Sequence, residues 1–264
     1  MVLNAILRNL VGVLRVGSRA EQPQRSISLD SNSICFCTLA IHVPYRRRAR
    51  LLCADVPSAP WVVVTDDPAD FADLPVHAIH HIPTGPMAID YLQRLGPTGN
   101  NNGAAAYHDK RFAVRAALQE YDTAIFLDAD SRLDALPPIG SFPPGLAVIP
   151  IVRESIAVHL ETCGPWRLPV FEELARYLIG DADILQTAGW CHETCYAVTK
   201  DGNESQFFWA WDRAVDFLHR QGMYSGEGGV MGLAAAYAGW KINYELLAHL
   251  GSLIQHEGGG PKDQ

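Results

Sequence analysis

The stretch TAIFLDADSRLDAL, residues 123–136, decides the fold because an apolar run ends there on two aspartates one residue apart. Residues 123–127 have the composition of a strand buried on both faces, and Asp128 and Asp130 follow at its carboxyl end. Ligands of open α/β sheets bind at that edge. Because strand side chains alternate with a period of two, both carboxylates are expected to point the same way. A divalent cation would relieve their repulsion, and Mg²⁺ or Mn²⁺ prefers such oxygen ligands.

The tripeptide Asp-Ala-Asp recurs at residues 181–183 in a different setting. About one D-x-D is expected by chance in a chain of this composition, so the context has to distinguish the two copies. The second copy follows RYLIG, which is typical of a helix ending at a glycine, and no strand directs it towards a sheet edge. We therefore interpret Asp181 and Asp183 as part of a solvated loop or a helix cap.

Apolar runs alternate with helical patterns along the rest of the chain. Strands are expected at residues 34–41, 61–68, 75–83, 123–130, 145–152 and 188–199, and helices at 46–56, 104–121, 205–222 and 228–239. Apolar strands separated by helices are typical of a mostly parallel sheet covered on both faces. The sequence therefore predicts an α/β fold, with a single domain over residues 31–264 that includes an appended carboxyl-terminal portion.

Composition narrows the class of protein. The net charge of −8 argues against a protein that binds nucleic acid, because phosphate contacts require a basic surface. Arg46, Arg47, Arg48 and Arg50 are interpreted as a solvated helix face, and a site for a small phosphorylated ligand is the alternative. The six cysteines, Cys163 among them, are predicted to be buried reduced thiols, which favours the cytoplasm.

The first thirty residues are expected to form a helix and a linker. Apolar residues from Leu3 to Leu14 follow helical spacing, but no run is long enough to span a bilayer, and no secretory cleavage site follows. The helix is predicted to dock on the core or on a partner subunit. Peripheral membrane contact through residues 1–16, or a transit peptide, is the alternative, and the oligomeric state is left open.

The order of these motifs resembles the GT-A class of nucleotide-sugar-dependent glycosyltransferases. A first strand ends near Thr38, a second ends in TDD at 65–67, a helix carries HDKR at 108–111, and a strand closes on FLDAD. A glycine-rich stretch with an acid and a late histidine follow, so the resemblance spans about residues 33–260. It implies a Rossmann-type sheet with a nucleotide-binding half, residues 31–135, and an acceptor half, residues 136–264.

The resemblance also implies an activity. Asp128 and Asp130 would hold Mn²⁺ or Mg²⁺, and the metal would grip the diphosphate of a UDP- or GDP-sugar, with Asp128 nearer the ribose or sugar. The sugar would pass to a hydroxyl of a saccharide or other acceptor. The cation acts as a Lewis acid on the departing diphosphate, and Lys110 or Arg111 would neutralise more of its charge. The alternative for Lys110 and Arg111 is a solvated helix start.

Other residues are assigned to the nucleotide and the acceptor. Asp66 and Asp67 would accept hydrogen bonds from a ribose or base, or would form a turn closed by Asp-Pro, and Thr38 is a candidate of the same kind. The stretch GWCHETCYAVT, residues 189–199, would face the acceptor with three side chains: Trp190, His192 and Glu193. The Trp190 ring suits stacking on a sugar, and a core tryptophan is the alternative.

Two late residues complete the predicted site. Glu227 stands at the start of a helix, where a carboxylate serves as a cap or as the base that deprotonates the acceptor hydroxyl in inverting members. Retaining members such as glycogenin and its bacterial galactosyltransferase relatives end on a histidine, a glycine and a lysine at the metal. The resemblance makes His256 a metal ligand and Lys262 a diphosphate contact, although the spacing differs here and Pro-Trp is missing. His249, in YELLAHL, is interpreted as a packed histidine on a helix.

Two other functions fit the same motif. FLDADSRL also resembles the nucleophile motif of haloacid-dehalogenase-type phosphatases, in which Asp128 would attack phosphorus and Asp130 would act as acid and base. Ser131 and Arg132 replace the Gly-Thr of that motif, and the later acidic pair is not visible in the sequence. A catalytically silent module that binds nucleotide sugars is the second alternative.

Overall fold

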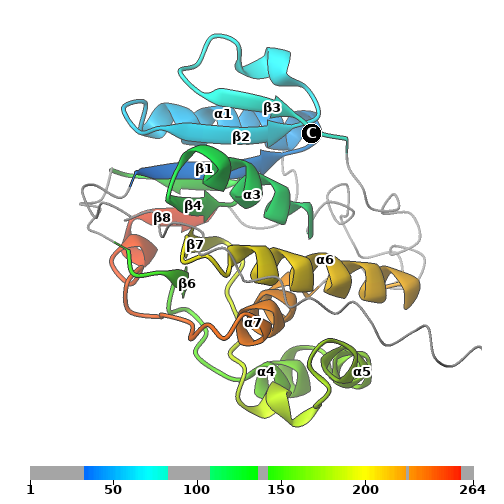
Figure 1. The fold of residues 1–264 in the computed structure, drawn as a ribbon. Helices are drawn as coiled ribbons and strands as arrows, with labels where there is room; N and C mark the ends of the chain where they lie inside the picture. The colour runs from blue at the N-terminus through cyan, green and yellow to red at the C-terminus, as the bar shows by residue number, and fades with distance from the viewer. Residues whose placement is uncertain (1–32, 83–107, 136–141, 224–225, 257–264) are drawn as a thin grey trace, which may run out of the picture. The chain divides into compact units, whose positions relative to one another are not determined.

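The computed structural model describes residues 33–82, 108–135, 142–223 and 226–256. Within this part of the chain, a six-stranded sheet has the order β3-β2-β1-β4-β7-β6 (Figure 1). Its strands are β1 (Ile34–Ala40), β2 (Trp61–Thr65), β3 (His77–His80), β4 (Thr123–Leu127), β6 (Gly145–Val148) and β7 (Cys195–Thr199). The first four are mutually parallel, and β7 is antiparallel to both of its neighbours.

Helices cover both faces of the sheet, and side-chain alternation separates the two cores. Cys37 and Phe126 belong to the core shared with α3, α6 and α7, whereas Phe36 and Ile125 belong to the core shared with α1. The prediction of an α/β fold with a mostly parallel sheet is therefore confirmed. The α-helices are α1 (Val43–Asp55), α3 (Lys110–Glu120), α4 (Ile156–Cys163), α5 (Leu168–Ile179), α6 (Glu204–Arg220) and α7 (Glu227–Tyr237). Short 3₁₀ helices are η1 (Pro68–Phe71), η3 (Pro165–Arg167), η4 (Asp183–Gln186) and η5 (Leu250–Ser252).

The strand order reverses beside β1, and this reversal positions the site. The chain runs from β1 to β2 and β3 on one side, and then returns to place β4 on the other side of β1. Ligands of open α/β sheets bind outside the carboxyl ends of the strands at such a point. Asp128 directly follows β4 at this edge. Because β7 is antiparallel, with Cys195 opposite Leu127, the loop that enters β7 arrives at the same edge.

A separate two-stranded sheet lies beside the aspartate motif. It pairs β5 (Ser131–Leu133) with β8 (Ile254–His256), and Ser131 lies opposite His256 in the register. The Gln255 side chain donates to both carboxylate oxygens of Asp134, at 3.0 and 3.2 Å. The backbone of a late segment is thereby held directly after Asp130. The side chain of His256 and residue Lys262 lie outside the described part of the chain.

Two secondary-structure predictions, for residues 244–250 and for residues 188–199, are wrong. Residues 244–249 form bends and turns rather than an α-helix, since the Ala248 and Leu250 N–H groups donate to carbonyls three residues back, those of Glu245 and Leu247. His249 is consequently exposed rather than packed, and Leu247 and Leu250 are buried in its place. The strand expected at 188–199 is limited to 195–199, since residues 189–194 form a loop.

The cysteine prediction is confirmed with one exception. Cys35, Cys37, Cys53, Cys191 and Cys195 are buried and free, whereas Cys163 is exposed at the end of α4. Among the described residues, no helix combines the length and the apolar character needed to cross a bilayer. The helix predicted at the start of the chain lies outside the described residues.

Candidate functional site

The centre of the site is a buried ammonium group between two carboxylates. Lys110, the first residue of α3, places its Nζ 2.8 Å from Asp128 Oδ1 and 3.4 Å from Glu227 Oε1. Its Nζ also lies over the Phe126 ring of β4, 5.7 Å from the ring centroid. The Lys110 side chain is buried, so the alternative of a solvated helix start is excluded for it. The structure therefore brings together three residues that the sequence predicted for one site.

Glu193 joins this group from the loop that enters β7. Its Oε1 accepts the Gly228 N–H at 3.1 Å, and the Cys191 N–H donates to the Gly228 carbonyl at 3.3 Å. The next residue in the loop, Thr194, accepts the Asp128 N–H through its carbonyl at 2.9 Å. The loop thus connects the start of α7 to the end of β4. Lys110, Asp128, Glu193 and Glu227 are called the carboxylate cluster below.

The glycines of α7 explain how the loop approaches so closely. A Cβ at Gly228 would collide with the Cys191 carbonyl oxygen, and one at Gly232 with the Gly189 carbonyl oxygen. Gly226, which precedes the helix, has φ 96°, a left-handed conformation that favours glycine. The glycine-rich stretch GEGGVMG therefore serves close packing of the loop against α7. That packing aligns Glu193 with Glu227.

Burial and like charge separate the pKa values of the two glutamates. Burial, reinforced by the charge of Glu227, raises the pKa of Glu193 to about 7. Burial also acts to raise the pKa of Glu227, but Lys110 and His108 outweigh it and the pKa is lowered. The pKa of Asp128 is raised, because burial is only partly offset by Lys110. Two of the three carboxyls thus hold protons more tightly than they would in water.

The second aspartate of the motif faces the start of α1. Asp130 Oδ2 lies 3.7 Å from Arg48 Nη1, and both side chains are largely buried. The charges of both aspartates affect the Tyr45 phenol. Burial is the main cause of its raised pKa, the charge of Asp130 is the next, and the charge of Asp128 adds to them. Asp128 and Asp130 are thus paired with different cations, Lys110 and Arg48, and the charge of each raises the pKa of Tyr45.

The donor set fits a hard divalent cation that keeps some ligands from water or substrate. Two neighbouring carboxylates at a strand end supply oxygen ligands of the kind that Mg²⁺ and Mn²⁺ bind together with phosphate. Burial raises the pKa of Asp128 and Lys110 only partly offsets it, so a bound cation would further stabilise the carboxylate. Within the described residues, no group of three or more His, Cys, Asp or Glu side chains is arranged to hold a metal. The predicted third ligand, His256, has only its backbone described, opposite Ser131.

Arg111 is buried like Lys110 but binds elsewhere. Its Nε lies 2.7 Å from Asp212 Oδ1 of α6, and its Nη1 donates to the His108 carbonyl at 2.6 Å. The solvated alternative is therefore wrong for Arg111 as well, although its contacts tie α3 to α6. His108 is buried, and burial lowers its pKa to about 4. In the described part of the chain, neither ring nitrogen of His108 has a hydrogen-bond partner.

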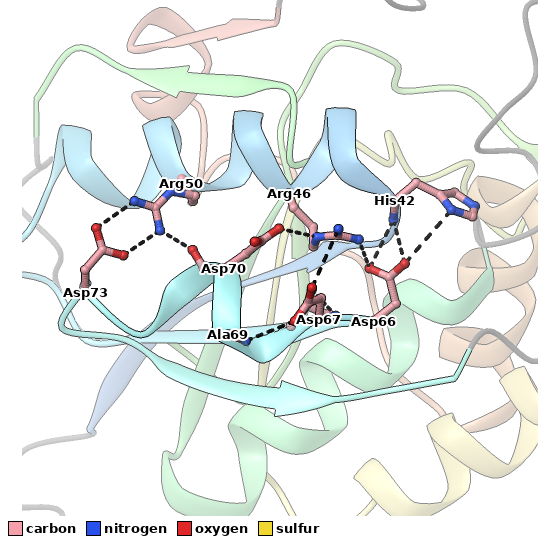
Figure 2. A network of polar contacts seen from close by, with 9 residues as sticks. His42, Arg46, Arg50, Asp66, Asp67, Ala69, Asp70 and Asp73 are labelled. Carbon is pink, nitrogen blue, oxygen red and sulfur yellow. Dashed lines mark hydrogen bonds and ion pairs between the residues drawn. The ribbon is translucent and has the colours of Figure 1, made fainter.

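Asp66 and Asp67 lie in a second polar cluster, shown in Figure 2. Asp66 accepts the His42 N–H with both carboxylate oxygens, each at 3.1 Å, and its Oδ1 lies 2.7 Å from Arg46 Nη1. His42 has φ 70°, a strained value for a residue other than glycine, and Asp66 fixes it at the start of α1. Asp67 accepts the Ala69 N–H at 3.2 Å and caps η1, as the turn alternative expected.

The arginines of α1 extend this cluster. Arg46 Nε lies 2.5 Å from Asp70 Oδ2, and Arg50 binds both oxygens of Asp73 at 2.6 and 2.7 Å and also the Asp70 carbonyl (Figure 2). The prediction of a solvated helix face is wrong for Arg46, which is buried, whereas Arg47 is exposed. These residues are called the arginine network below: His42, Arg46, Arg50, Asp66, Asp67, Asp70 and Asp73.

The remaining candidates have less direct geometry. Trp190 is buried and stacks on His159 with ring centroids 3.7 Å apart, which favours the core alternative over stacking on a sugar. His192 is partly exposed, and its Nδ1 accepts the Thr194 N–H at 3.4 Å. Thr38 is fully buried inside β1, two residues before the strand ends, and its hydroxyl has no partner among the described residues. Its role as a nucleotide contact stays a prediction.

The second Asp-Ala-Asp copy behaves as interpreted from the sequence. Asp181, in the loop after α5, and Asp183, the first residue of η4, are both exposed, and Asp181 Oδ1 accepts the Asp183 N–H at 2.9 Å. The sequence analysis missed Tyr45 and His108, and its interpretation of Arg48 as solvated is wrong, because that side chain is largely buried beside Asp130. His108 lies in the quoted motif HDKR, two residues before Lys110, and Arg48 lies in the quoted arginine cluster, so both signals were present.

Searches of protein-family models and of curated protein sequences found no match for this chain.

Proposed function

We propose that the protein is a metal-dependent glycosyltransferase that moves a sugar from a nucleoside-diphosphate sugar to a hydroxyl acceptor. The supporting observation is the bridge of Lys110 between Asp128 and Glu227. It joins the predicted metal motif to the predicted acceptor-side acid, and it lies where the strand order reverses beside β1. That edge of an α/β sheet is the usual place for a nucleotide ligand.

On the donor side, the chain supplies two carboxylates and one ammonium group. Asp128 and Asp130 would hold Mn²⁺ or Mg²⁺, which when bound supplies Lewis-acid stabilisation of the departing diphosphate. The Lys110 ammonium, 2.8 Å from Asp128 Oδ1, is placed to neutralise further negative charge on that group. Burial acts to lower the pKa of Lys110, but the negative charges of Asp128 and Glu227 outweigh it and raise the pKa. The side chain therefore stays protonated.

On the acceptor side, a carboxylate of Glu227 or Glu193 would receive the proton of the attacking hydroxyl. Glu227 is the residue that the sequence predicted for this task, and Glu193 lies beside it through the bond to Gly228 N–H. A carboxylate in hydrogen-bond reach of the acceptor is sufficient for general-base catalysis. The cytoplasm remains the predicted location for this activity.

The test is a thermal-shift screen of UDP- and GDP-sugars with Mn²⁺. We expect one or more donors to raise the melting temperature of the wild type only when the metal is present. Asp130→Ala should abolish that increase, because it removes one of the two predicted metal ligands. Asp183→Ala, in the exposed second Asp-Ala-Asp copy, is the matched control and should keep the increase in full. A wild type that ignores every donor with metal would contradict the proposal.

The same preparation separates the two alternative functions. A phosphatase would turn over a phosphomonoester such as p-nitrophenyl phosphate and would lose that turnover in Asp128→Asn, which removes the nucleophile. A silent module would show the Mn²⁺-dependent shift with a donor but would neither hydrolyse nor transfer its sugar over hours. Slow, metal-dependent release of the nucleoside diphosphate supports the transferase against both.

A further inference from the structure

The two glutamates of the carboxylate cluster have different partners. Glu227 lies 3.4 Å from the Lys110 ammonium, so its negative charge has a direct counter-charge. Glu193 instead accepts a neutral backbone N–H, that of Gly228, at 3.1 Å. Lys110 is itself shared with Asp128. Of the two glutamates, Glu227 is therefore held as an anion, and Glu193 is the one that a proton would stabilise.

The two glutamates also differ in their exposure to solvent. Glu227 is buried, whereas Glu193 is partly exposed and lies in the loop that reaches the sheet edge. Its neighbour Thr194 accepts the Asp128 N–H, so Glu193 stands one residue from a direct backbone contact with the metal motif. The part of the loop that carries Glu193 is therefore fixed next to the metal motif.

We propose that Glu193, rather than Glu227, accepts the proton of the acceptor hydroxyl, an inference that rests on the proposed glycosyl transfer. The acceptor O–H bond breaks and its proton passes to a Glu193 carboxylate oxygen. The acceptor oxygen uses the electron pair to bond the anomeric carbon. The bond from that carbon to the diphosphate oxygen breaks, and its electron pair leaves with the nucleoside diphosphate. Glu227 keeps Lys110 in place and is a positioning residue.

The charges around Glu193 suit this role. Glu227 faces it from α7, Lys110 from α3, and Cys191 from its own loop. Burial and Glu227 together place the pKa of Glu193 at about 7. A general base works best when its pKa is close to the working pH, because a carboxylate of ordinary pKa is too weak a base. The lowered pKa of Glu227 makes it the weaker base of the two.

The first measurement follows the carboxyl groups directly in protein labelled with ¹³C at the glutamate side-chain carboxyl carbon. We expect one glutamate to titrate with a midpoint of about 7 and that signal to vanish in Glu193→Gln. In Glu227→Gln the signal should remain with a lower midpoint, because a neighbouring negative charge is gone. Glu204→Gln is the matched control, since Glu204 also accepts backbone N–H groups at a helix start, and it should change nothing near pH 7. A signal that persists in Glu193→Gln would overturn the assignment.

The second measurement is slow hydrolysis, with water as acceptor, of a UDP- or GDP-sugar that gives the Mn²⁺-dependent thermal shift. We expect the wild-type rate to rise with pH through about 7. Glu193→Gln should keep the thermal shift but lose about 10²-fold or more in rate, together with the pH dependence. If Glu193→Gln keeps both rate and pH profile, this inference fails while the proposed function stands. If no donor shifts the wild type, or none is hydrolysed, the proposed function fails and this inference with it.

Discussion

The arginine network and the carboxylate cluster both contain more acids than bases, but they hold that excess in different surroundings. In the arginine network, the Asp67 and Asp73 side chains are 47% and 66% exposed. In the carboxylate cluster, Asp128 and Glu227 are 19% and 9% exposed. Water screens the first group, and it reaches the second far less. The same imbalance of charge therefore has different consequences.

The pKa values express this difference. The Arg50 guanidinium lowers the pKa of Asp73 to about 2, whereas burial raises the pKa of Glu193 to about 7. The arginine network stabilises Asp73 as an anion, whereas the carboxylate cluster favours protonation of Glu193. A buried deficit of positive charge is a feature of sites that bind a cation or exchange a proton. Burial, rather than the number of acids, therefore distinguishes the carboxylate cluster, a candidate site, from the arginine network.

The largest difference in stability between the two regions is expected when one cation is removed from each. Lys110→Met leaves buried carboxylates without a counter-charge, so we expect the free energy of unfolding to fall by about 3–5 kcal/mol at pH 8. The loss should be smaller at pH 5, where the carboxyls take up protons. Urea unfolding followed by tryptophan fluorescence measures both values.

Arg50→Met is the matched change in the arginine network, where Asp73 stays solvated. We expect a much smaller loss of stability, with little dependence on pH between 5 and 8. Equal losses for the two variants would show that exposure does not distinguish the regions, and the interpretation of the carboxylate cluster would then be wrong.

A second prediction concerns the pH dependence of stability. Glu193 has a pKa of about 7 in the folded chain against an ordinary 4.5, so its contribution is complete below pH 4.5 and is lost as the pH rises through about 7. The free energy of unfolding of the wild type, relative to Glu193→Gln, should therefore fall over that range. The difference between the two pKa values sets an upper limit of about 3 kcal/mol. Urea unfolding at pH 5, 6, 7 and 8 measures the fall.

The contribution of Asp73 to stability is expected to have the opposite pH dependence. Its pKa is lowered from 3.8 to about 2, so its contribution is present above 3.8 and is lost only as the pH falls towards 2. Asp73→Asn should therefore leave the slope between pH 5 and 8 unchanged. A slope that disappears in Asp73→Asn and survives in Glu193→Gln would reverse the assignment of the two regions.

The smallest expected effect concerns Asp67, which serves as a cap of η1 and is also a predicted nucleotide contact. Asp67→Ala removes the cap of η1 and should cost about 0.5–1 kcal/mol, whereas Asp67→Asn keeps a capping oxygen and should cost less. Thermal unfolding compares the two variants. If Asp67 serves only the turn, both should keep the full donor-induced thermal shift. Loss of that shift in Asp67→Asn would instead place Asp67 at the nucleotide, as the resemblance implies.

Local signals were sufficient to predict much of the fold and part of the site. The apolar run before Asp128 fixes a buried strand, and a carboxyl-terminal edge follows from the parallel order of the neighbouring strands. Helical patterning predicts a helix that contains Lys110 and another directly after Glu227, although it does not place the start of α3 at Lys110. These features depend on residues close together in the sequence, where spacing and turn residues carry the information.

Contacts between distant segments could not be predicted in the same way. Lys110 and Glu227 are 117 positions apart, and their contact depends on the packing of the 189–194 loop against the glycines of α7. Arg46 is buried because acids 20 and 24 positions later neutralise it, which no charge pattern within α1 reveals. His249 was misplaced because two buried leucines in a turn imitate helical spacing.

The pairing of β5 with β8 has a consequence for the order in which the protein is made. Asp134 and Gln255, which are joined by a hydrogen bond, lie 121 positions apart. During translation, the aspartate motif and most of the sheet leave the ribosome well before residues 254–256 do. The strand beside the motif acquires its partner only then, so the site is completed late in synthesis. A chain cut between these segments would keep the motif but lack the backbone that pairs with Ser131.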